Sequence, residues 1–171
     1  MAKPIPARRA LAAAALVGLL GACATLGDLI QAPIFSEASG QEPRLRLLAP
    51  SRDLPSGGAA VRLWARVENP NSFGVNLAGL TGDLFLENVR AAGVDFPLGV
   101  PLSALGDTVV PLDISVGFGD LPDLADLAQR ALFGGTLGYS LRGTVSVDAG
   151  PLGTPSFGPE TLLRGELDVL R

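Results

Sequence analysis

Short segments in which apolar and polar residues alternate are the feature that most limits what this 171-residue chain can fold into. The clearest case is residues 61–68, whose apolar positions are Val61, Leu63, Ala65 and Val67. A period of two places these side chains on one face of a β-strand and the charged or aromatic ones on the other. The segment is therefore predicted to be a half-buried strand.

The same alternation recurs along the rest of the chain, with glycine and proline in the gaps. It is strong in three further segments, residues 110–116, 139–147 and 163–169. It is weaker in four others, residues 44–48, 75–80, 83–89 and 94–96. Several short strands with one polar face each and turn residues between them predict an all-β fold, an antiparallel β-sandwich.

One segment has helical spacing instead. Its apolar residues recur every three or four positions, and they are Leu121, Leu124, Leu127, Ala128, Ala131 and Leu132. Acidic residues precede it and Gly134-Gly135 follows it, so we expect one short amphipathic helix over about residues 121–133. Asp120, Asp123 and Asp126 are candidate calcium ligands by residue type. Their position at a helix N-terminus explains them better, because no loop there has EF-hand spacing. We expect no metal or cofactor.

The first 22 residues have the order of a secretory signal peptide. Basic residues come first, and an apolar run of 11 residues follows from Ala10 to Leu20, which is too short to span a bilayer as a helix. The run ends in Leu20-Gly21-Ala22-Cys23, which resembles the bacterial lipoprotein box. We therefore expect cleavage before Cys23 and acylation of Cys23, the only cysteine of the chain. The alternative, an ordinary signal peptide, leaves an unpaired exported thiol without explanation.

The expected processing divides the chain into three parts. Residues 1–22 form the signal peptide, residues 23–42 form a lipid-anchored tether with room for one short docked piece, and residues 43–171 form the domain. Ala24 follows the cysteine, which resembles the outer-membrane type of sorting signal. The expected location is the bacterial cell envelope, facing the periplasm, with the outer membrane favoured over the inner.

The composition excludes most catalytic chemistry. The chain has no histidine and its one lysine is Lys3, so the mature protein lacks an imidazole, an amine for a Schiff base and, once Cys23 is acylated, a thiol. From Cys23 onward ten basic residues face 17 acidic ones, which argues against nucleic acid as a partner. A hydrolase built on paired carboxylates is chemically permitted, but nothing else in the sequence supports one. We expect no enzymatic activity.

The tripeptide Asn69-Pro70-Asn71 follows the strongest strand. Proline fixes its own φ, pushes Asn69 to an extended conformation, and leaves both amides able to bond to nearby backbone. We interpret the tripeptide first as a structural turn. Trp64 lies on the polar face between Arg62 and Arg66, where stacking on a guanidinium explains it more simply than a docking role.

The order of these pieces resembles the late embryogenesis abundant group 2 family, also called the water-stress and hypersensitive-response domain. The pieces are Asn69-Pro70-Asn71, residues 75–80, residues 102–116, the expected helix and residues 139–145, and the resemblance covers about residues 43–171. It implies an Ig-like or fibronectin-III-like sandwich with one helix and no catalytic residues. Residues 84–88 depart from the family's Gly-bearing turn, which leaves the hairpin there undefined.

The lipoprotein box thus predicts a membrane-anchored envelope protein. The resemblance implies that this protein protects against desiccation or related stress by keeping client proteins or membrane surfaces apart. The alternative is a module that binds a lipid or another apolar ligand between its sheets, or that docks an envelope partner through a strand edge. The sequence does not define the oligomeric state.

Overall fold

The computed structural model describes residues 29–119 and 136–170, and this part of the chain is all-β. Its strands are β1 (Ile34–Glu37), β2 (Arg44–Leu48), β3 (Gly58–Glu68), β4 (Val75–Leu86), β5 (Val89–Leu102), β6 (Asp107–Gly117), β7 (Leu137–Asp148) and β8 (Ser156–Leu170), with one 3₁₀ turn, η2 (Gly150–Leu152). The signal peptide, Cys23 and the helix expected over about residues 121–133 lie outside the described residues. Within the described ranges there is no helix with the length and apolar character needed to cross a membrane.

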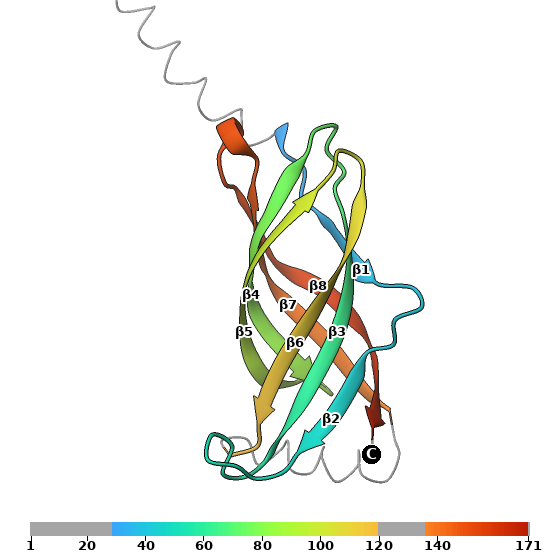
Figure 1. Cartoon of the computed structure of the whole chain (residues 1–171), viewed down its shortest axis with the longest axis vertical. Helices are drawn as coiled ribbons and strands as arrows, with labels where there is room; N and C mark the ends of the chain where they lie inside the picture. The colour runs from blue at the N-terminus through green and yellow to red at the C-terminus, as the bar shows by residue number, and fades with distance from the viewer. Residues whose placement is uncertain (1–28, 120–135, 171) are drawn as a thin grey trace, which may run out of the picture.

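The strands form two sheets that are joined along one edge (Figure 1). In the first sheet β3 pairs with β6 on one side and with both β1 and β2 on the other. The second sheet has the order β5-β4-β7-β8. The join is a parallel pairing of β2 with β8, in which Arg44 lies opposite Asp168. The expectation of purely antiparallel pairing was wrong at this join, where the two strands come from opposite ends of the chain.

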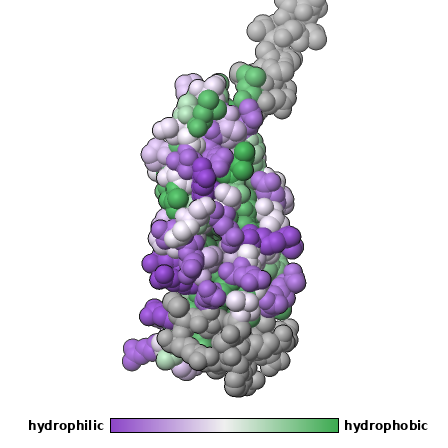
Figure 2. All heavy atoms as spheres, turned by 90° about the vertical axis from the view of Figure 1, so that its right-hand side faces the viewer, coloured by the Kyte–Doolittle hydropathy of each residue, from purple (hydrophilic) through white to green (hydrophobic). Residues whose placement is uncertain are grey.

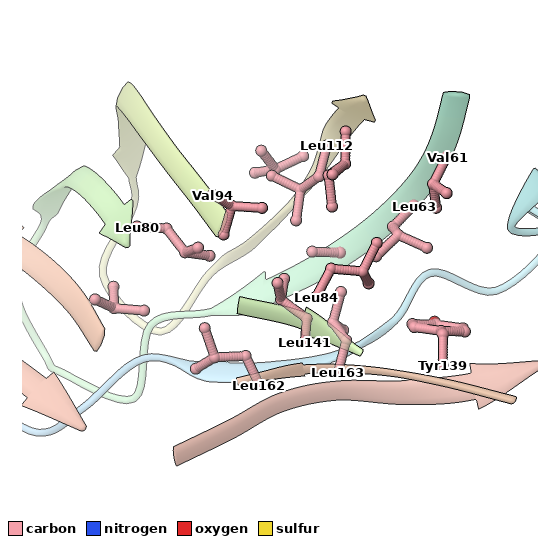
Figure 3. Packing of buried hydrophobic residues seen from close by; sticks show 14 of the residues in the cluster. Val61, Leu63, Leu80, Leu84, Val94, Leu112, Tyr139, Leu141, Leu162 and Leu163 are labelled. Atoms are coloured by element: carbon pink, nitrogen blue, oxygen red, sulfur yellow. The ribbon is translucent and has the colours of Figure 1, made fainter. Parts of the chain in front are cut away.

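The core lies between the inward faces of the two sheets, as the alternation predicts. Along β3, the buried residues are Val61, Leu63, Ala65 and Val67, each at most 1% exposed. Leucines from the other strands belong to the same core and are equally buried: Leu77, Leu80, Leu84, Leu112, Leu141 and Leu167. Figure 3 shows Leu80, Leu84, Leu112 and Leu141 among them. The predicted face of β3 is confirmed, and burial of these side chains supplies the main driving force for folding.

Two of the weaker strand predictions were wrong in extent. Residues 75–80 and 83–89 were expected to be separate, but β4 runs without a break from Val75 to Leu86. Gly82, which suggested a gap, lies opposite Gly143 of β7. A Cβ on either glycine would collide with backbone of the other strand, so glycine here permits a close approach of β4 to β7 rather than a turn.

The hairpin between β4 and β5 is a two-residue turn. Leu86 pairs with Val89, and the intervening Glu87 and Asn88 have φ of 48° and 66°. Two positive φ values in a two-residue loop are typical of a type I′ turn, whose twist matches that of the flanking strands. The segment whose hairpin the sequence left undefined therefore makes a tight connection, and β5 extends for 14 residues beyond it rather than the few expected around residues 94–96.

The ordered domain begins before residue 43. Within the segment interpreted as a tether, β1 pairs with the last residues of β3, and Ile30 and Ala38 on either side of it are buried. The described chain starts at Leu29, at the end of the molecule where the β3–β4, β5–β6 and β7–β8 connections also lie (Figure 1). We call this end the loop end; it consists of residues 29–33, 69–74, 103–106 and 149–155.

Candidate functional site

The Asn69-Pro70-Asn71 turn is the most densely hydrogen-bonded side-chain cluster among the described residues. Asn69 and Asn71 are each 2% exposed. The Nδ2 of Asn69 donates to the backbone oxygens of Phe73 and Ser103, both at 2.9 Å. Its Oδ1 accepts from the backbone nitrogen of Asn71 at 3.0 Å and from the Asn71 Nδ2 at 2.9 Å. One buried amide therefore closes its own turn and joins it to the β5–β6 connection.

Asn71 extends this cluster to the N-terminal segment. The backbone nitrogen of Gln31 donates to the Asn71 Oδ1 at 2.8 Å, and the Asn71 Nδ2 donates to the Gln31 oxygen at 3.0 Å. The side-chain amide thus replaces a peptide group of a neighbouring strand. The backbone oxygen of Asn71 also accepts a hydrogen bond from the backbone nitrogen of Leu105 at 3.0 Å. Three segments of the loop end are therefore held together by two asparagines.

The asparagine cluster stabilises the fold of the loop end and has no group that could transfer protons near neutral pH. Amides do not titrate, and the donors and acceptors of both side chains have partners inside the protein. Beside it is a hollow of about 270 Å³ that Ile34, Pro70 and Leu105 help to line. Arg66 on its wall donates to Asp107 at 3.0 Å, and this hydrogen bond raises the pKa of the arginine. Sequence reasoning identified the turn but not Gln31 or Ser103, because their approach depends on the fold.

A second polar contact links β1 to β7. The Tyr139 hydroxyl, on a residue only 4% exposed, donates to the Glu37 carboxylate at 2.6 Å. Burial, and then the hydrogen bond to Glu37, raise the pKa of Tyr139 well above its ordinary value. Gly165 of β8 lies opposite Tyr139, and a Cβ there would meet the Glu37 carboxylate. No local sequence pattern predicts this pair, since its members lie about 100 residues apart.

Tyr139 makes the stability of the domain sensitive to alkaline pH. Its pKa is higher in the folded protein than the ordinary value of 10.0, so its contribution is complete below about pH 10 and is lost as the pH rises above it. Because Tyr139 is the only tyrosine of the chain, the near-ultraviolet absorbance of phenolate reports on it alone. We expect no phenolate above pH 10 until circular dichroism shows unfolding. Phenolate formation near pH 10 in the folded domain would contradict this assignment.

The outward face of β3 carries paired charges. Arg62 donates to both carboxylate oxygens of Asp113 on β6, at 2.5 and 2.8 Å, and this pairing lowers the pKa of Asp113. The Arg62 guanidinium carbon lies 6.0 Å from the centroid of the Trp64 ring, as the stacking interpretation requires. These groups are solvent-exposed, so the pairs contribute little stability. Within residues 29–119 and 136–170, no three His, Cys, Asp or Glu residues cluster as metal ligands would.

Comparison with known proteins identifies the family of the chain and finds solved structures with a similar fold. The model of the late embryogenesis abundant protein family matches residues 65–160, which is just over half of the chain. The solution structure of AT1g01470 from Arabidopsis thaliana has a TM-score of 0.59 at 17% identity, over 83% of this chain and 85% of that one. The solution structure of the late embryogenesis abundant protein At2g46140.1 has a TM-score of 0.53 at 18% identity, over 94% of this chain and 84% of that one. No curated protein matches the sequence significantly. The chain belongs to the late embryogenesis abundant group 2 family.

Proposed function

We propose that this protein is a non-catalytic, stress-protective β-domain that acyl chains on Cys23 hold at a membrane of the cell envelope. The observation that carries the proposal is the family match over residues 65–160. The late embryogenesis abundant domain is related to stress, and the anchor and the physiological role are the parts that we add. The proposal includes an Ig-like or fibronectin-III-like sandwich with a helix over about residues 121–133.

The chemistry of the described surface supports a role without turnover. Its ion pairs join carboxylates to arginines, as in Arg62–Asp113, Arg66–Asp107 and Arg90–Asp83. The hydrogen bonds from Arg62 lower the pKa of Asp113, so this carboxylate is a poor general acid. Besides Tyr139, whose raised pKa lies far above neutral pH, the buried polar side chains of the described core are Asn69, Asn71 and Ser140, none of which titrates near neutral pH.

The sequence before the sheet supports the anchor. It has a basic start, an apolar run of 11 residues and Leu20-Gly21-Ala22-Cys23, in the order of a lipoprotein signal. Two or three acyl chains on one cysteine hold a protein stably at a bilayer. A domain tethered in this way would present its paired, hydrated surface charges to neighbouring proteins or lipids. Such a surface keeps neighbours apart as water is lost, without binding any of them tightly.

The alternative function, binding of a lipid or another apolar ligand or docking of an envelope partner, receives less support. An internal ligand needs space between the sheets, but the inward side chains of β3, β4, β6 and β7 pack against one another there (Figure 3). The described surface hollows are shallow, and the one of about 360 Å³ beside β7 is lined by polar residues including Glu87, Arg142 and Arg164. We therefore favour the protective function.

Complementation of a deletion strain tests the proposal. Cells lacking the gene are dried and rehydrated, and survival is compared after expression of wild type, Cys23→Ser, Asp113→Asn or Asp148→Asn. We expect full rescue by both carboxylate variants, because their side chains face solvent and do no chemistry. We expect poor rescue by Cys23→Ser, which membrane fractionation should show as released or unprocessed protein.

Two results would contradict the proposal, and they affect different parts of it. Loss of rescue by one carboxylate variant that remains folded and membrane-bound would indicate a catalytic or binding carboxylate. Correctly processed, membrane-bound Cys23→Ser protein would show that Cys23 is not the anchor, while leaving the protective role of the domain intact.

A further inference from the structure

The loop end carries the most exposed large apolar side chains of the described chain. Leu105 is 73% exposed and Leu29 is 63% exposed, and Ile34 just below them on β1 is 53% exposed. Figure 2 shows hydrophobic residues gathered toward this end, and hydrophilic ones over the middle of the same face. Single exposed apolar residues are ordinary, but their concentration at one end of an elongated domain is not.

The loop end is also free of charge in its sequence. None of the four segments that form it, residues 29–33, 69–74, 103–106 and 149–155, contains Asp, Glu, Lys or Arg. At the opposite end, the β2–β3 connection carries Arg52 and Asp53, and the β4–β5 turn carries Glu87. Removing an uncharged end from water avoids the large cost of desolvating ions. The two ends of the sandwich therefore differ in how readily they can leave water.

Leu105 is held at this end in a backbone conformation that leucine rarely adopts. Its φ is 52°, in the left-handed region that favours glycine or asparagine. The hydrogen bonds of the neighbouring backbone, from Leu105 to Asn71 and from Gly106 to Ser103, fix the turn that presents it. A strained position that leaves an apolar side chain 73% exposed gains the folded domain little packing energy. The geometry suits a side chain that is buried against something else.

The length of the chain before the domain limits what that partner can be. Five residues lie between Cys23 and Leu29, so the anchoring cysteine is six residue steps, at most about 20 Å of fully extended chain, from the loop end. The reciprocal hydrogen bonds of Gln31 with Asn71 hold the start of the described chain at this end of the sandwich. An acyl anchor on Cys23 therefore brings the bilayer surface close to Leu29 and Leu105.

We propose that the loop end rests on the bilayer to which Cys23 is anchored, with Leu105 and Leu29 entering the lipid–water interface and the sandwich standing away from the membrane. This inference rests on the proposed acylation of Cys23. Asp107 and Glu68 lie just below the end, and Arg66 bonds to both, at 3.0 and 3.5 Å, which reduces their repulsion from anionic headgroups. The Glu87-Asn88 turn and the Arg52-Asp53 loop then face away from the membrane.

Quenching by brominated lipid tests this orientation. The acylated full-length protein is reconstituted in phosphatidylcholine vesicles whose acyl chains carry bromine. Trp64, the only tryptophan, is replaced by phenylalanine, and one new tryptophan is placed by Leu105→Trp at the loop end or by Asp53→Trp at the opposite end. We expect at least twofold quenching of the tryptophan at position 105 and none at position 53. Hydrogen exchange of the unmodified acylated protein provides a check without substitutions, since residues 103–106 should gain protection on vesicles and residues 49–57 should not.

Vesicle flotation separates failure of the orientation from failure of the anchor. If both variants float with the vesicles but the tryptophan at position 105 is not quenched, the orientation is wrong although the anchor stands. Equal quenching at both positions would mean that the sandwich lies flat on the membrane, which overturns the proposal. Dimers that cross-link through position 105, without quenching there, would show that the loop end contacts a second copy of the chain, and this result also overturns the proposal. If neither variant floats, acylation of Cys23 fails, and the orientation fails with it.

Discussion

Leu63→Asp is expected to prevent folding of the domain. Leu63 is 0% exposed at the centre of β3, so the substitution removes a buried apolar side chain and places a carboxylate where no cation can reach it. Each effect costs several kcal/mol, and together they approach the roughly 5–15 kcal/mol by which a domain of this size is stable. Circular dichroism and denaturant unfolding of the soluble domain measure the loss.

The matched control is the next residue along the same strand. Arg62 faces solvent, where it pairs with Asp113 and lies near Trp64. Arg62→Asp removes these contacts and places two carboxylates opposite each other, but both are exposed to solvent, so the cost is small. We expect a small decrease in the denaturation midpoint and an unchanged fold. Comparable losses from the two substitutions would show that the faces of β3 have been assigned the wrong way round.

Asn69→Ala is expected to cost about 2–4 kcal/mol of unfolding free energy, because each buried polar group left without a partner costs about 1–3 kcal/mol. The substitution leaves the backbone oxygens of Phe73 and Ser103 without the Asn69 Nδ2. It also removes the Asn69 Oδ1, which accepts from the backbone nitrogen and from the Nδ2 of Asn71. Hydrogen exchange should rise throughout the loop end, including the segment around Gln31 that Asn71 holds. Denaturant titration gives the magnitude, and exchange mapped by mass spectrometry gives its location.

Ser72→Ala is the control for this prediction, since Ser72 lies in the same turn but is exposed. We expect it to change stability by less than about 0.5 kcal/mol. If Asn69→Ala were equally mild, water would be replacing the lost amide. The asparagine cluster would then not be what holds the three segments together.

The sequence predicted strands best where one face is buried and the other is solvated. Residues 61–68 are the clearest example, because a period of two directly reflects which face lies on the core. Prediction from the sequence failed where a glycine can mark either a turn or a close approach of two strands. Gly82 suggested a break in β4, but it serves a close crossing with Gly143 that depends on the register of two strands far apart in sequence. Register of that kind leaves no trace in a local pattern.

One part of the candidate site could be predicted from local sequence, and the rest depends on the fold. The turn at Asn69-Pro70-Asn71 follows from local chemistry, because proline and asparagine restrict and bond to their own backbone. Gln31, which completes the cluster, carries no signal of its own, since its backbone rather than its side chain makes the contacts. Likewise, no sequence pattern distinguishes Leu105 from other loop residues, because its exposure and positive φ are properties of the folded chain.

The parallel pairing of β2 with β8 has a consequence for how the domain is made. Its partners lie about 120 residues apart, so the two sheets are joined only after the last strand has been synthesised. Such a topology has a high contact order and folds slowly, because the loop-closure entropy is lost before the pairing forms. Loss of β8 would leave β2 with an open edge prone to pairing with other chains.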